Sequence, residues 1–410
     1  MALYRQYAPD FKIEINGEEI PAELRSSITS VVYQDGRNAA DRVEVEFANT
    51  NLRWLQNHIR GLGFRPYPTG VKIGSVGDAS FADRNLFDID NKLSFAVGYA
   101  PDPLEKVFLG EITGVEADFP TSGMPAMRLI AHDYLHRLSA GSYARGFGIL
   151  PDFLIAALLS AENLLLPAID PVGVGSPSIA LAALDAIFKK TGSKQKGQSD
   201  LELLKELAER YDADFWVEGD VLYLSRFIKE YEPRLTLTWG ETLLNFSPKV
   251  STVGQIAGIS MKFTLSGVSA LIGFLLTVFW DFDRERLGVS VIPDVAVNIG
   301  GIAPVYNTKV VTQSLVGGPV MTLIHSHLSN PADITNSVFK IVRKLRQTLN
   351  NRLTGQGSAI GDPRIRAGTV IKLEGLGPDF SGNYRVTSAN HLIDGSGYRT
   401  VFKVSKEILP

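Results

Sequence analysis

Alternation of hydrophobic and polar residues dominates the first part of the chain. Apolar side chains at every second position mark the segments 11–15, 43–47 and 93–99, and the dipeptide Asn16-Gly17 follows the first of them. This period of two is typical of half-buried antiparallel strands, and an Asn-Gly pair favours a tight hairpin turn. The pattern therefore predicts that residues 1–150 form a β domain.

The middle of the chain changes to a helical pattern. The segments 151–163 and 178–190 are rich in Ala and Leu, and Ser199 with Glu202 forms a capping box before an amphipathic run. Two short alternating runs then flank the turn residues at 219–220, which indicates a hairpin. Residues 151–230 are therefore predicted to form a small α+β module.

Strand patterns return from residue 231 to the end, with one interruption. Asn330-Pro331 can start a helix, and apolar residues recur every three or four positions as far as Leu353. We expect this helix, near 331–354, to end at Gly355-Gln-Gly357. Residues 231–410 are otherwise predicted to be a second β domain. The expected fold is mainly β, with two β domains flanking a helical, α+β insert.

One stretch, 263–280, is uncharged and close to the lower length limit for a membrane-spanning helix. It contains Ser, Thr and Gly, it ends in strand-forming residues, and the residues just before it alternate. Two buried strands joined by a turn explain this better than a spanning helix, and no stable membrane insertion is expected. A membrane-associated pore component is the alternative.

Composition limits the classes of function that the chain could have. The chain has 410 residues, 45% of them hydrophobic and 21% charged, with 41 basic and 44 acidic side chains. This balance gives no global electrostatic argument for specific nucleic-acid binding. The absence of cysteine excludes disulfides and thiolate metal sites. Met1–Asp10 has no signal-peptide apolar core, so assembly in the cytoplasm is expected.

Two histidine pairs are the candidates for metal chemistry. His132 and His136 have the spacing of a zinc-protease helix, but Asp133 stands where that motif needs Glu, and no third ligand is evident. His325 and His327 would share one face of a strand. Packing, capping or solvated polar roles are favoured for both pairs, and no catalytic residue, cofactor or metal is predicted. A metal-dependent hydrolase using either pair is the alternative.

Three runs of residues resemble the phage late control D family. They are FLGEITG at 108–114, the segment 129–138 with Phe119-Pro120 before it, and the C-terminal stretches 361–368 and 373–388 completed by 398–405. The matching positions singled out as structural are mostly glycines, prolines and packing residues: Gly110, Phe119, Pro120, Asp133, Leu135, Arg137, Gly361, Pro363, Gly368, Gly375, Gly377, Phe380, Gly382 and Tyr384. The glycines permit tight corners between strands.

The resemblance implies a non-enzymatic baseplate hub, similar to the central hub of contractile tails and to the N-terminal part of VgrG spikes. Such hubs carry two barrels related to the tail-tube subunit. A homotrimer would present six barrels and join the six-fold tail tube to the three-fold spike of a phage tail, tailocin or cellular contractile injection system. The implied partners are the chain itself, the tube protein, other baseplate proteins and the spike. Because the sequence stops at Pro410 after its second β region, the spike is expected to be a separate polypeptide.

Overall fold

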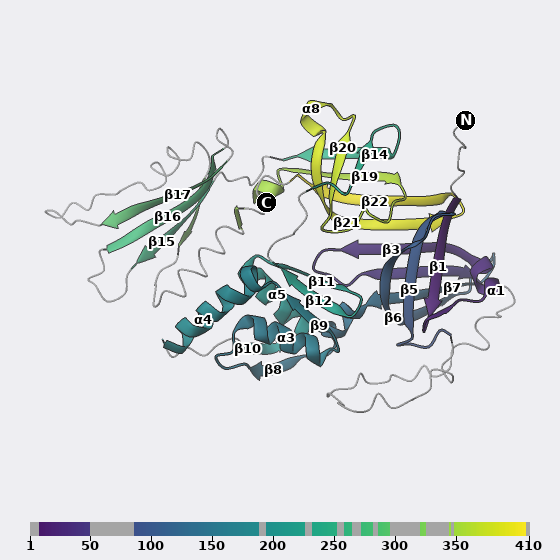
Figure 1. Cartoon of the computed structure of the whole chain (residues 1–410), viewed down its shortest axis with the longest axis horizontal. Coiled ribbons are helices and arrows are strands. Elements are labelled where there is room, and N and C mark those ends of the chain that lie inside the picture. Colours follow the sequence, from purple (N-terminus) through teal and green to yellow (C-terminus); the bar gives the residue numbers. More distant parts are fainter. Residues whose placement is uncertain are drawn as a thin grey trace.

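The computed structural model of the chain describes residues 8–49, 86–187, 194–225, 232–251, 258–264, 272–281, 286–295, 320–324, 344–345 and 348–406. Its largest element is a 13-stranded sheet that contains strands from both ends of the chain. Two small sheets accompany the helices of the middle segment, and a four-stranded sheet stands apart from the rest (Figure 1). The structure confirms the predicted mainly β fold with an α+β module.

The N-terminal β unit contains the strands predicted from alternation. Asn16 and Gly17, with φ angles of 55° and 85°, form the predicted hairpin turn. The unit has the strand order β3-β4-β7-β6-β5-β1-β2, with each neighbouring pair antiparallel. Its elements are β1 (Ala8–Ile15), β2 (Glu18–Glu19), α1 (Ala22–Ser27), β3 (Ile28–Gly36), β4 (Arg42–Ala48), β5 (Lys92–Ala100), β6 (Glu105–Asp118) and β7 (Ala126–Asp133).

The α+β module follows directly. Ser199 and Glu202 form the predicted capping box at the start of α5, whose buried face packs on the other helices. The predicted hairpin is the pair β11–β12. The elements are a 3-10 helix (Tyr134–Ser139), β8 (Tyr143–Gly146), α3 (Asp152–Glu162), β9 (Leu166–Ile169), a π-helical turn (Pro171–Gly175), α4 (Ser176–Ile187), β10 (Lys194–Gln198), α5 (Asp200–Tyr211), β11 (Asp214–Glu218) and β12 (Val221–Ser225).

The C-terminal β unit has the strand order β14-β19-β22-β21-β20-β13. The alternating apolar residues of its strands enclose a core that includes Tyr384 and Phe402. Its elements are β13 (Leu235–Thr238), β14 (Leu243–Val250), β19 (Leu353–Ile360), β20 (Val370–Glu374), α8 (Gly377–Phe380), β21 (Gly382–Asp394) and β22 (Gly397–Ser405).

A four-stranded sheet lies between β14 and β19 in the sequence. It comprises β15 (Gly258–Thr264), β16 (Ile272–Asp281), β17 (Arg286–Val295) and β18 (Val320–Ile324) in the order β17-β16-β15-β18. The uncharged stretch 263–280 therefore belongs to two antiparallel strands, as predicted, while its connecting residues 265–271 lie outside the described residues. None of the helices in the described part of the chain is long and apolar enough to span a membrane.

The predicted position of the C-terminal end of the long helix was wrong. Only 344–345 and 348–350 of this segment are described as helical; residues 331–343 lie outside the described residues. Leu353 and Gly355-Gln-Gly357 belong to β19, which pairs with both β14 and β22. The two glycines do not terminate a helix but leave room for aromatic rings of the neighbouring strands, Phe246 over Gly355 and Phe402 beside Gly357.

The two β units repeat one strand order. In chain order, β1, β3, β4, β5, β6 and β7 correspond to β13, β14, β19, β20, β21 and β22, and corresponding strands have corresponding neighbours. One pair differs in direction: β1 and β5 are antiparallel, whereas β13 and β20 are parallel. No local pattern of residues indicated this repeat; only the family resemblance implied two related β domains.

Candidate functional site

The two β units are joined by a strand pair that we call the seam. Strand β3 runs antiparallel to β21, with Ser30 opposite Asp394 at one end and Gly36 opposite Ser388 at the other. Figure 1 shows the C-terminal strands β21 and β22 continuing the sheet beside β3. Strands from opposite ends of the chain thus form one hydrogen-bonded surface.

A buried polar network holds the seam on one side. Arg366, from the loop before β20, donates its Nε hydrogen to Asp35 Oδ2 at 2.9 Å and its Nη2 hydrogen to the Tyr33 hydroxyl at 2.7 Å. The Tyr33 hydroxyl in turn donates to Asp41 Oδ2 at 2.7 Å. The Arg366 guanidinium also lies over the Tyr33 ring, 5.5 Å from its centroid. One arginine therefore links β3, the β3–β4 connection and the C-terminal β unit.

His391 lies opposite Tyr33 across the seam, and the two rings stack with 5.5 Å between centroids. Its Nε2 is 3.0 Å from the Ile365 carbonyl oxygen, and its Nδ1 is 2.7 Å from the Tyr398 hydroxyl. Because a carbonyl oxygen only accepts, Nε2 carries the hydrogen and Nδ1 accepts from Tyr398. Burial lowers the pKa of His391 to about 3, so the ring is neutral at ordinary pH.

Two further carboxyl groups lie near this network. Burial, followed by the charges of Asp35 and Asp133, raises the pKa of Asp41 well above its usual value. Burial also raises the pKa of Asp133 to about 7, although its carboxylate accepts a hydrogen bond from the Leu135 amide at 3.1 Å. The Arg366 charge opposes both shifts and does not cancel them. The seam thus contains more buried carboxyl groups than Arg366 alone can neutralise.

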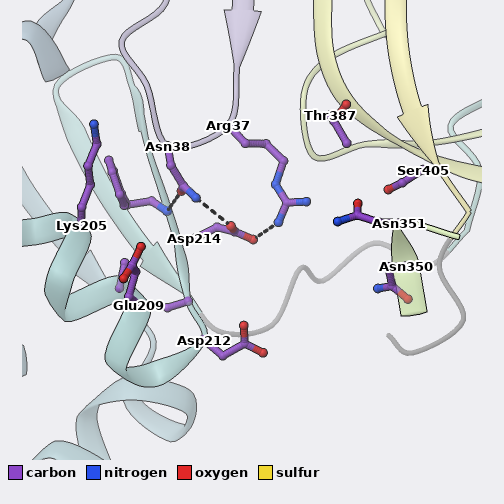
Figure 2. A pocket seen from close by; sticks show the side chains of 13 residues that line it. Arg37, Asn38, Lys205, Glu209, Asp212, Asp214, Asn350, Asn351, Thr387 and Ser405 are labelled. Carbon is purple, nitrogen blue, oxygen red and sulfur yellow. Dashed lines mark hydrogen bonds and ion pairs between the residues drawn. The ribbon is translucent and has the colours of Figure 1, made fainter. Parts of the chain in front are cut away.

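The turn between β3 and β4 also contacts the α+β module. Asp214 accepts hydrogen bonds from Arg37 and, at 3.2 Å, from Asn38 Nδ2; the Phe215 amide donates to Asn38 Oδ1 at 2.9 Å. Figure 2 shows these side chains at one wall of a pocket of about 390 Å³. Thr387, Ser405 and Asn351 line the opposite wall.

This pocket lies where the N-terminal β unit, the α+β module and the C-terminal β unit meet. Its described lining is mainly polar and holds neither histidine nor cysteine. The chemistry available there is hydrogen bonding and charge pairing, which fixes the three parts relative to one another.

No protein-family model matches the sequence, and no curated protein matches it. Several solved structures match it, and two of them illustrate the likeness. The 43 kDa tail protein of prophage MuSo2 from Shewanella oneidensis aligns with a TM-score of 0.57 and 9% identity, over 97% of this chain and 98% of that one. A tail protein from Neisseria meningitidis MC58 aligns with a TM-score of 0.56 and 10% identity, over 98% and 97%. This chain has the fold of these tail proteins.

The first set of residues that carry the late control D resemblance lies on β6, just beyond it, and at the start of the α+β module. A side chain at Gly110 would collide with the His132 carbonyl oxygen of β7, so this close approach requires glycine. Asp133 caps the 3-10 helix and Leu135 is buried in the module's core. Arg137 pairs with Glu111 and lies over the Tyr134 ring, 4.1 Å from its centroid. Phe119 and Pro120 are exposed just beyond β6.

The second set lies around β20 and β21. Gly368, Gly375, Gly377 and Gly382 have φ angles of 86°, 82°, 80° and 135°, a region that favours glycine. The Tyr398 ring occupies the space where a side chain at Gly361 would lie. Pro363 is in the loop that carries Arg366, and the Phe380 carbonyl accepts a hydrogen bond from the Tyr384 hydroxyl at 2.7 Å. The four glycines allow tight corners of the backbone, and the structural role expected for the whole set stays a prediction.

His132 and His136 do not form part of a metal site among the described residues. His132 Nδ1 is 2.7 Å from Thr113 Oγ1, and His136 Nδ1 is 2.6 Å from the Asp133 carbonyl oxygen. Among the described residues there is no group of three His, Asp or Glu side chains placed to bind a metal ion. His325 and His327 lie outside the described residues. The geometry at His132 and His136 favours the packing and capping interpretation.

Sequence reasoning missed the residues that hold the parts together: Asp35, Arg366, His391 and Asp214. A signal existed for two of them. Asp35 follows Val31 and Tyr33 at even spacing, and His391 stands between Ala389 and Ile393 in the same way. A polar residue in the buried register of a strand indicates a partner from elsewhere in the fold. Arg366 and Asp214 carried no such local signal.

Proposed function

We propose that this chain is a structural hub subunit of a contractile, phage-tail-like injection machine, in which three copies join a six-fold tail tube to a three-fold spike. The observation that carries the proposal is the end-to-end match of fold with two tail proteins, over nearly the full length of both chains. A match over nearly the whole chain supports a shared overall fold rather than one shared module.

The repeated β unit supports the adaptor role. Each chain brings two units of one strand order, joined edge to edge at the seam. Three chains would bring six such units, so a ring of three copies can match a six-fold tube on one side and a three-fold spike on the other. Closed rotational symmetry would limit the assembly to this size.

In this proposal the protein acts by shape and carries no catalytic function. Strand edges and sheet faces would contact neighbouring copies, the tube protein, the spike and other baseplate proteins. The chain would assemble in the cytoplasm and become part of the particle, with membership of the late control D family as the specific relationship.

Native mass spectrometry tests the proposal. The purified protein should be a trimer, or become one when a spike protein is added. Electron microscopy of that species should show a three-fold ring with six similar lobes. A monomer that stays a monomer with the spike protein present would contradict the hub function. Lys196→Glu, an exposed change on β10 of the α+β module, serves as a control that should assemble normally.

A further inference from the structure

The two β units share the register of their strands as well as their order. The pair β3–β4 has an irregularity between Ile28 and Ser30, and the corresponding pair β14–β19 has one between Leu243 and Asn245. From there on, the residues pair one to one in both units. Val31 therefore corresponds to Phe246, and Asp35 corresponds to Val250.

The same holds for β6 and β21. The pair β6–β7 shifts register between Ile112 and Gly114, and β21–β22 shifts between Val386 and Ser388. The preceding loops also agree: the Asp90 amide donates to the Ile112 carbonyl at 2.9 Å, and the Gly368 amide donates to the Val386 carbonyl at 2.8 Å. Two shared bulges and a shared loop contact fix the correspondence of every residue in these strands.

The correspondence shows that one pairing between the two units is formed within the chain, while the equivalent pairing of their other edges is not. Within the chain, β3 of the first unit pairs with the second half of β21 in the other unit. Their counterparts are β14 and the second half of β6, Gly114–Asp118. Among the described strands, β14 pairs only with β19, and Gly114–Asp118 pairs only with β7. Within the described part of the chain, one such joint is formed, and the two strand edges that could form a second one have no partner strand there.

We propose that β14 of one copy pairs antiparallel with Gly114–Asp118 of β6 in a second copy of this chain, and so repeats the seam between chains. The inference deepens the proposed function and rests on it, because three such intermolecular joints would alternate with three seams around the ring. The occupant of both edges is then the same protein, and the joint is heterologous and closes by rotation.

Transferring the seam register predicts which residues meet. At the seam, Ala389 is opposite Asp35 and Asn390 is opposite Gln34. The corresponding intermolecular pairs are Val115 with Val250, and Glu116 with Lys249. The first is an apolar pair and the second is a pair of opposite charge, both of which stabilise neighbouring strands.

The solvent exposure of side chains on the two edges agrees with the proposed pairing. Val250 is 54% exposed, whereas its counterpart Asp35 is 7% exposed beneath the seam. Ala117 is likewise exposed, whereas its counterpart His391 is buried. Strand edges with exposed apolar side chains readily pair with a further strand. Val250 and Ala117 are thus exposed in one chain at positions where the seam buries their counterparts.

The intermolecular joint would be weaker than the seam. Asp88 and Val250 stand at the positions of Arg366 and Asp35, so the buried ion pair has no counterpart there. Pro248, opposite Ala117, has no backbone N–H to donate. A permanent joint within the chain and a weaker joint between chains suit a subunit that folds first and assembles afterwards.

Cysteine crosslinking tests the pairing directly, because the natural sequence has no cysteine. A chain carrying Val115→Cys and Val250→Cys should form disulfides between copies on mild oxidation, giving covalent dimers and closed trimers. Val115→Cys with Ser247→Cys is the matched control: it is shifted by three residues, about 10 Å along the strand, and should not crosslink. The experiment is done on the assembled protein, with spike protein added if assembly needs it.

The possible outcomes distinguish a failure of the intermolecular joint from a failure of the proposed hub function. Trimers by mass that show no crosslink for the in-register pair would overturn the joint and leave the hub intact. Covalent chains longer than three copies would support the joint and contradict the three-copy ring. If hydrogen exchange at β14 and at Gly114–Asp118 slows only when tube or spike protein is added, those edges belong to that partner and the pairing of copies is overturned.

Discussion

Arg366 and Asp35 are joined across the seam, with 2.9 Å between Nε and Oδ2. The Ala367 amide donates to the same carboxylate oxygen at 3.0 Å. The pair ties the loop before β20 to the end of β3, so that residues far apart in sequence hold the two β units together. Because both groups are largely buried, each needs the other to offset its loss of hydration.

Arg366→Met should lower the free energy of unfolding by about 3–5 kcal/mol, because it leaves the buried Asp35 carboxylate without its counter-charge. Urea denaturation followed by circular dichroism measures this. Adding Asp35→Asn to the Arg366→Met chain should recover part of the loss. Arg364→Met is the matched control: its ion pair with Asp362 is on the surface, and its removal should change stability by no more than about 1 kcal/mol. Equal losses for the two arginines would contradict the role given to the seam.

Asp133→Asn should change the pH dependence of stability. The folded-state pKa of Asp133 is about 7, above the value of about 4 for an unfolded aspartate. Between these values the folded protein binds more protons than the unfolded chain, so this group lowers stability as pH rises from about 4 to 7. The Asp133→Asn protein does not lose this stability as pH rises, and its side-chain amide oxygen can still accept the hydrogen bond from the Leu135 amide.

Relative to the natural protein, the Asp133→Asn chain should therefore gain on the order of 2–4 kcal/mol between pH 4 and pH 8. Thermal denaturation across this range is the measurement. The two proteins should be most alike near pH 4. Parallel curves at every pH would show that Asp133 does not titrate in this window.

Local patterns predicted the elements of this fold but not their assembly. The period-two segments became β1, β4 and β5, and the Ser199–Glu202 capping box starts α5. Each depends on neighbours in sequence. The seam pairs Tyr33 with His391, and no local pattern contains information about so distant a partner.

The repeat of the two β units was not visible in the residue pattern for a related reason. Corresponding positions hold chemically different residues, such as Asp35 and Val250, or His391 and Ala117, because one set is buried at the seam and the other is exposed. Shared backbone register survives such differences, since bulges depend on main-chain pairing. The family resemblance did identify the glycines, because their role in turns and close strand contacts depends directly on the backbone.

Gly110→Ala tests one of those glycines. The added methyl group would meet the His132 carbonyl oxygen of the adjacent strand, and main-chain atoms cannot move aside cheaply. The substitution should destabilise the protein by about 2 kcal/mol or more, through forced separation of β6 and β7. Gly146→Ala is the matched control, because its added methyl group meets open space. The thermal midpoint should fall for the first change and stay nearly constant for the second.

A charge swap tests the predicted meeting of Glu116 and Lys249. Lys249→Glu alone should weaken association of the copies, on the order of two- to fivefold for each joint at low salt, because two carboxylates would then face each other. Glu116→Lys should weaken it as well, and it also removes a contact with Arg128 in the same chain. The chain with both changes should associate more tightly than either single variant, since the pair is restored with its charges exchanged.

Sedimentation of the assembled protein measures these differences, and they should shrink as salt is raised, since both groups are exposed before assembly. Lys196→Glu makes the same charge change on the α+β module and should leave association unaltered. If the double variant is as weak as the sum of the single ones, Glu116 and Lys249 act independently. They are then not neighbours in the ring, and the register transferred from the seam is wrong.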